Sequence, residues 1–195
     1  LQRLTSREIN ATLSLPSAPV FAFDANRVLN DLRKNFPELY NMSVAVELPA
    51  KVTITVEERQ PLLAWRQNDR TYWVDAQGVM FPPRGDEQLP LVVNAETDVL
   101  LPSLVEAQPD TQLLTPEFVE TILKVQSVAP DGAELVFTQE HGLGWLDPRG
   151  WTTYIGMDMK DIDMRLKIYK AITSYVRQNK IQPVMISVEF LPTDL

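Results

Sequence analysis

The chain has 195 residues, with 18 lysines and arginines against 26 aspartates and glutamates, a net charge of −8, one histidine and no cysteine. The lack of cysteine excludes disulfides, thiolate zinc sites and cysteine nucleophiles, and the single His141 cannot build a multi-histidine metal site. The acidic balance argues against nucleic acid as a partner, because phosphates attract Lys and Arg. No apolar run approaches the about 20 residues that span a bilayer, and because the chain begins without Met we expect a further segment upstream.

The first sixty residues predict two helices followed by a β-hairpin. Thr5 or Ser6 can cap a first helix, and Asp24 can cap a second helix that ends before Pro37. Apolar and polar residues then alternate on both sides of a turn at Pro49, which is typical of two antiparallel strands with one buried face. Because two helices must cover one face of so small a sheet to enclose a core, we expect a third strand upstream of this region.

From residue 62 the pattern is mostly β, with two further helices. Thr115 can cap a helix from Pro116 to about Val125, and a longer helix with one apolar stripe covers about residues 160–178. Gly78 suits a turn position with positive φ. Short strands are expected at residues 63–65, 72–74, 79–81, 91–93, 135–138, 143–146, 151–155 and 184–191.

Charge and a proline both mark a boundary near residue 61. Residues 1–60 carry seven basic and seven acidic side chains, whereas residues 61–195 carry the whole net charge of −8. We therefore expect an α+β protein with two domains. Residues 1–61 form two helices on a small sheet, and residues 62–195 form a mostly antiparallel β domain with a long C-terminal helix and a terminal strand.

Three sets of polar residues resemble catalytic or metal sites, and each has a plainer interpretation. His141 lies between two expected strands without a nucleophile motif such as G-x-S-x-G, so an exposed turn residue is the favoured interpretation. Asp69 and Asp75, which suggest the carboxylate pair of a glycosidase, both fall at expected turns. Three acidic residues that do not fit an EF-hand loop suit the positive end of the long helix: Asp158, Asp161 and Asp163. We therefore expect no enzyme activity, no cofactor and no metal.

The segment before Pro61 ends an expected strand with several charges. There are two alternatives for this segment. It is a solvated strand end, or it is the junction (the seam) between the two expected domains, at which Arg59 pairs with a carboxylate of the other domain. We favour the junction, and Arg59 and Pro61 are its expected residues.

In the final expected strand, every second residue from Val184 to Phe190 is apolar, and these residues alternate with a set that includes Ser187 and Glu189. Val184, Ile186, Val188 and Phe190 are expected to pack under the long helix. A strand at the end of a chain is often at a sheet edge, and an open edge is a template for a partner strand. An edge protected by charge and proline is the equal alternative. The long helix beside this strand carries basic residues, which form a solvated face or, as the weaker option, meet an acidic partner helix: Lys160, Arg165, Lys167, Lys170, Arg177 and Lys180.

The order and spacing of several short motifs together resemble one protein family. The two-helix module is followed by an E-R-x-P motif, a strand ending in Trp, a V-D-x-x-G turn with a later aromatic residue, an L-P pair, a G-W-x-x-Y-x-G motif, a long helix and a terminal strand. The chain thereby resembles the extracytoplasmic part of the bacterial cell-division protein family FtsQ/DivIB. The motifs are carried by Glu58-Arg59 with Pro61, Ala64-Trp65, Val74 to Gly78 with Phe81, Leu89-Pro90, Gly150-Trp151 with Tyr154 and Gly156, Arg165-Leu166, and Ile186–Phe190.

The resemblance implies a POTRA domain, here without its first strand, followed by the family's β domain. It implies a non-enzymatic scaffold of the division machinery that binds proteins of the FtsL and FtsB (DivIC) type, with the last strand extended by a segment of the FtsB-type partner. It also implies a membrane anchor in a segment that is not in this chain, with this region on the extracytoplasmic side at the septum.

The family's terminal strand often reads V-D-L-R-Y, which matches Ile186–Phe190 here. Phe190 keeps the aromatic position that contacts the partner, whereas Ser187 replaces an acidic residue and Glu189 replaces an arginine. A partner segment should therefore carry Lys or Arg near Glu189. The expected partner-binding residues are Met185, Ile186, Ser187, Val188, Glu189, Phe190 and Leu191.

Two rival functions come from other classes of protein. The first is a POTRA-bearing module of protein transport or outer-membrane assembly, although such modules occur in tandem before a barrel and the second half shows no barrel-like strand series. The second is a carboxylate-based hydrolase of the cell wall, for which Asp75 and Glu58 are the residues to replace.

Overall fold

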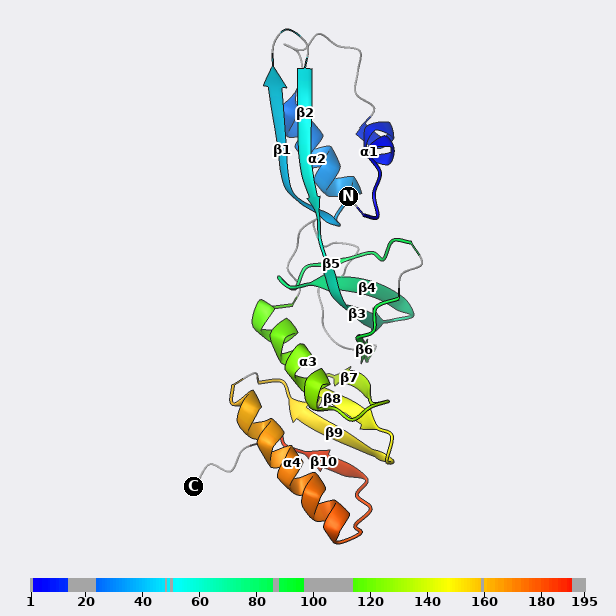
Figure 1. Ribbon diagram of the computed structural model, residues 1–195, viewed down its shortest axis with the longest axis vertical. Coiled ribbons are helices and arrows are strands. Elements are labelled where there is room, and N and C mark those ends of the chain that lie inside the picture. Colours follow the sequence, from blue (N-terminus) through cyan, green and yellow to red (C-terminus); the bar gives the residue numbers. More distant parts are fainter. Residues whose placement is uncertain are drawn as a thin grey trace.

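The computed structural model describes residues 2–13, 24–47, 49, 51–85, 88–96, 114–158 and 160–190, and it holds two separate sheets (Figure 1). The first is a hairpin, and the second has eight strands. Strand β2 of the first sheet ends at Glu58 and strand β3 of the second begins at Pro61, so the chain passes between the sheets within two residues. The turn residue Pro49 lies within the described ranges, and Leu191 lies outside them.

The first unit packs helices α1 (Ser6–Leu13) and α2 (Ala25–Asn35) against strands β1 (Leu39–Glu47) and β2 (Lys51–Glu58). Strands β1 and β2 are antiparallel, as the alternation predicts. The caps are also confirmed. The Thr5 hydroxyl accepts from the Glu8 amide while the Glu8 carboxylate accepts from the Thr5 amide, and Asp24 accepts from the Arg27 amide. The core of this unit is apolar: Leu4, Ile9, Leu13, Val28, Leu32, Phe36 and Leu39.

The second unit is a mixed sheet in the strand order β10-β9-β8-β7-β6-β3-β4-β5. The pairs β3–β6, β6–β7 and β9–β10 are parallel and the other four pairs are antiparallel. The strands are β3 (Pro61–Gln67), β4 (Arg70–Asp75), β5 (Met80–Phe81), β6 (Val92–Ala95), β7 (Glu134–Thr138), β8 (Gly142–Asp147), β9 (Trp151–Gly156) and β10 (Met185–Ser187). The α+β class and the mostly antiparallel arrangement are confirmed.

Helices α3 (Pro116–Val128) and α4 (Ile162–Gln178) lie on the same side of this sheet (Figure 1). Thr115 caps α3 by accepting from the Phe118 amide, as predicted. The buried stripe of α4 also matches the prediction: Ile162, Leu166, Tyr169, Thr173 and Val176. Of these residues, Ile162, Leu166 and Tyr169 belong to the main core, in which Tyr169 packs edge-on against Trp145.

Two sequence predictions about this region are wrong. The terminal strand has three residues instead of eight, and Val184 and Phe190 are 86% and 88% exposed instead of packed under α4. The Ser187 hydroxyl donates to the Glu189 carboxylate and accepts from the Glu189 amide, and such local bonds compete with a strand ladder. Arg165 does not lie on a solvated face. It is buried, and it donates to the carbonyls of Ile155 and Asp158.

Within the described ranges, no helix has the length and apolar content needed to cross a bilayer.

Candidate partner-binding edge and domain seam

Strand β10 lies at one end of the eight-stranded sheet, as expected from its place at the end of the chain. Among the described residues it pairs with β9 alone, in parallel, with Ile186 opposite Thr153. Its outer side therefore presents backbone groups without a neighbouring strand, which is the geometry that accepts an added strand.

The backbone hydrogen bonds show which residues face outward. The Val184 carbonyl accepts from the Thr152 amide at 3.1 Å, and the Val188 amide donates to the Tyr154 carbonyl at 2.9 Å. Alternate residues of a parallel strand point their backbone groups to the same neighbour. The even-numbered residues thus bond to β9, and the N–H and C=O groups of Met185 and Ser187 point away from the sheet.

The side chains divide the predicted partner-binding residues into two sets. Ile186 and Val188 are buried, so they hold the strand against the core and offer a partner no side chain. Phe190 is 88% exposed and Met185 49% exposed, so both offer apolar surface at the edge. An exposed aromatic ring next to open backbone groups is suited to anchor a peptide.

Glu189 has an intramolecular partner that the sequence does not reveal. Its side chain is 10% exposed, and its carboxylate lies 3.1 Å from the Nδ1 atom of His141, which stacks on Tyr154 with ring centroids 4.3 Å apart. His141 is a turn residue, as predicted, but it is paired and only partly exposed. A cation from a partner would have to compete with His141 for Glu189. The two residues are 48 positions apart, so no local signal connects them.

Arg59 occupies the passage between the two sheets. Its guanidinium donates to Asp75 at 2.8 Å, with the two side chains 8% and 3% exposed, and its Nε atom donates to the Pro37 carbonyl. Pro61 begins β3 directly opposite Asp75. The expected pairing of Arg59 with a carboxylate across the seam is therefore present.

Two further sets of contacts lie near the junction, one within the first unit and one between the two units. The Glu58 carboxylate accepts from the backbone amides of Gln2, Arg3 and Leu4. Burial opposes ionisation of Glu58, but these amides outweigh it and hold its pKa below the ordinary value. From the second unit, Arg84 donates to Glu38 at 2.8 Å and approaches Glu8 at 3.4 Å. Sequence reasoning missed Arg84, because its partners lie far away in the chain.

The carboxylates that suggest catalysis have structural partners. Asp75 pairs with Arg59 and also accepts from the turn amides of Gln77 and Val79. These contacts support the turn interpretation and engage both carboxylate oxygens of Asp75 within the protein.

The three acidic residues around the start of α4 do not share a common contact. Asp158 accepts from the Lys160 amide, and Asp163 lies 3.8 Å from Lys124. Asp161 precedes the helix in a left-handed conformation and makes no side-chain cap bond. Within the described residues no group of three or more His, Asp or Glu side chains is placed to hold a metal ion.

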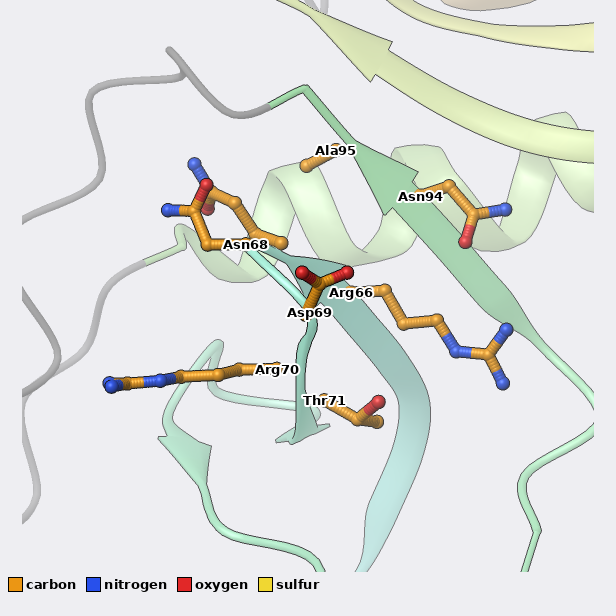
Figure 2. Close-up of a pocket in the computed structure, with 8 residues that line it drawn as sticks. Arg66, Asn68, Asp69, Arg70, Thr71, Asn94 and Ala95 are labelled. Atoms are coloured by element: carbon orange, nitrogen blue, oxygen red, sulfur yellow. The ribbon is translucent and has the colours of Figure 1, made fainter.

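A polar cavity of about 720 Å³ lies at the tip of the β3–β4 hairpin (Figure 2). Arg66 pairs opposite Thr71, and Gln67 pairs opposite Arg70, so the two arginines belong to opposite faces of the sheet. Figure 2 shows their side chains pointing away from one another. They cannot converge on one anion, and the cavity is a weaker candidate than the β10 edge.

Comparison with known proteins gives two family matches. The model described as "POTRA domain, FtsQ-type" matches residues 1–59, and that described as "Cell division protein FtsQ/DivIB, C-terminal" matches residues 63–186. The cell division protein FtsQ of Mycobacteroides abscessus is 25% identical over 143 residues, which are 71% of this chain and 44% of that protein. The cell division protein FtsQ of Streptomyces venezuelae is 30% identical over 79 residues, 40% of this chain and 29% of that protein. The matched region is therefore less than half the length of each relative.

Proposed function

The chain belongs to the FtsQ/DivIB family of cell division proteins, and from this premise we propose that it is a non-enzymatic scaffold of the division machinery. In this proposal residues 1–61 act as a POTRA domain and residues 62–195 as a partner-binding β domain. The protein is held at the cytoplasmic membrane by a segment outside this chain, with the two domains on the extracytoplasmic side at the septum. The partners are proteins of the FtsL and FtsB (DivIC) type.

The observation that carries the proposal is the open edge of β10. Met185 and Ser187 direct backbone groups outward, and Phe190 adds an exposed aromatic ring beside them. A partner segment in extended conformation can extend the sheet here, because backbone hydrogen bonds supply affinity and side-chain contacts supply selectivity.

The test is calorimetric binding of an FtsL/FtsB-type pair to the whole chain. Phe190→Ala should weaken binding at least about tenfold, because burying a large apolar side chain contributes roughly 1.5–3 kcal/mol. The matched control is Val46→Ala, since Val46 is 43% exposed on the other sheet. Unchanged affinity in Phe190→Ala, or an equal loss in the control, would refute the edge site.

A second variant tests the backbone part of the interaction. Met185→Pro removes an outward N–H and leaves the ladder to β9 intact, and the first residue of a strand is a position that tolerates proline. Weaker binding with unchanged thermal stability supports strand addition. Full binding by this variant contradicts it.

A further inference from the structure

The one histidine of the chain lies beside the proposed partner-binding edge. His141 is in the turn between β7 and β8, and its Nδ1 atom lies 3.1 and 3.3 Å from the two carboxylate oxygens of Glu189, shortly after β10. Histidine is the side chain whose charge ordinarily changes between about pH 5 and 8. A group that can gain a proton in this range therefore contacts the residue that we expect to select the charge of a partner segment.

The contact between His141 and Glu189 can persist whether or not the ring is charged. Because Nδ1 faces carboxylate oxygens, a neutral ring must carry its hydrogen on Nδ1 and donate it to Glu189, and the second proton then adds to Nε2. The Oε1 atom of Glu189 also accepts from the Ser187 hydroxyl at 2.8 Å, whereas Oε2 has His141 as its one hydrogen-bond partner among the described residues. Glu189 thus keeps an oxygen that can accept from a partner, and protonation of His141 changes the local charge and not the fold.

The other ionised groups around the ring are carboxylates. The Nε2 atom lies 3.9 Å from the exposed carboxylate of Glu140, and Glu96 accepts from the backbone of the same turn. Among the described residues, no lysine or arginine forms an ion pair with Glu96, Glu140 or Glu189. Burial first, and these three carboxylates second, raise the pKa of the Tyr154 phenol, so the ring on which His141 stacks stays neutral. Carboxyl groups ordinarily titrate at lower pH, and His141 is therefore the expected source of a charge change at this place.

We propose that His141 is a proton-controlled specificity residue of the β10 edge. When its ring is neutral, the negative charge of Glu189 favours a partner segment that carries Lys or Arg beside it. When the ring is protonated, the imidazolium offsets this charge and the preference is lost. The inference rests on the proposed strand addition, whose backbone hydrogen bonds do not depend on the charge of Glu189. Acidification therefore weakens the binding of cationic segments and leaves the edge open to neutral ones.

The test is calorimetric titration of two synthetic peptides into the whole chain at about pH 5.5 and about pH 8. Both copy the extended segment of the FtsB-type partner, have blocked termini and contain no histidine. They differ only at the residue opposite Glu189, which is lysine in one peptide and glutamine in the other. The lysine peptide should bind about fivefold more tightly at the higher pH, which is the upper range for a partly exposed ion pair, and the glutamine peptide should bind equally at both. Equal affinity of the lysine peptide at both pH values would overturn the proposal and leave strand addition intact, whereas no binding by either peptide would overturn both.

Three variants assign the pH dependence to this contact. His141→Gln can still donate to Glu189 but cannot take up a second proton, so the lysine peptide should bind it equally at both pH values. Glu189→Gln should bind the lysine and glutamine peptides equally at either pH. Glu140→Gln is the matched control, because it removes the other carboxylate near the ring and keeps the contact with Glu189, so the pH dependence should remain. A pH dependence that persists in His141→Gln, or disappears in Glu140→Gln, would assign the effect to another group and overturn the proposal.

Discussion

The Arg59 guanidinium donates to the Asp75 carboxylate at 2.8 Å, and both side chains are almost fully buried where the chain passes from one sheet to the other. Removal of one partner from a buried ion pair costs about 3–5 kcal/mol, because the remaining charge is left without compensation. We therefore expect Asp75→Ala to lower the free energy of unfolding by about this amount in urea titrations. Asp31→Ala is the control, since the Arg27–Asp31 pair is exposed with 3.9 Å between its atoms and such pairs contribute at most about 1 kcal/mol. Equal effects of the two variants would contradict the structural role of Asp75.

Arg84 joins the two units, because it reaches from the second unit to Glu38 and Glu8 of the first, and we expect these contacts to restrict the angle between the units. Arg84→Ala should broaden the distribution of distances between spin labels at Thr53 and Gln178, which are exposed and lie in different units. The far-ultraviolet circular dichroism should stay unchanged, because no core residue is altered. Arg27→Ala is the control and should leave the distribution narrow. An unchanged distribution in Arg84→Ala would show that other contacts set the angle.

Glu58 makes the stability of the first unit depend on pH, because its carboxylate holds the N-terminal segment through the amides of Gln2 to Leu4. Its pKa is below the ordinary value of 4.5 because backbone amides outweigh the opposing effect of burial. A carboxyl group with a lowered folded-state pKa stabilises the folded state above its unfolded pKa, and this contribution is lost as the pH falls through the folded pKa. Urea midpoints of the parent chain should therefore fall from about neutral pH to about pH 3 more steeply than those of Glu58→Gln. Parallel pH profiles for the two proteins would contradict this assignment.

The caps and strand alternation were predictable because their signals are local. Thr5, Asp24 and Thr115 each accept from an amide three residues ahead, so the sequence contains the whole interaction. The positive φ of Gly78 is local in the same way. The edge position of the last strand agrees with the expectation that a C-terminal strand often lies at a sheet edge, and the structure supplies the proof among the described residues.

The side-chain contacts between residues far apart in the chain were not predictable from the sequence. Arg84 and Glu38 are 46 positions apart, and His141 and Glu189 are 48 apart, so only the folded chain brings them together. The length of β10 was misjudged for a different reason. Its alternation continues to Phe190, but the local hydrogen bonds between Ser187 and Glu189 compete with continuation of the ladder beyond Val188.

The contact between His141 and Glu189 should hold the residues that follow β10 in place. His141→Ala removes a hydrogen-bond partner of Glu189 and the ring stacked on Tyr154, so the bond from the Val188 amide to the Tyr154 carbonyl should open more often. Hydrogen exchange of the Val188 amide should become about tenfold faster, which corresponds to about 1.4 kcal/mol of local stability, close to the lower end of the range for a hydrogen bond to a charged group. Amides of β8 should exchange as before, because their partners on β7 and β9 are retained. Glu140→Ala is the matched control, since its carboxylate is 3.9 Å from the ring and 85% exposed. If Val188 is protected equally in all three proteins, Glu189 is held by Ser187 alone and His141 has no part in positioning the edge.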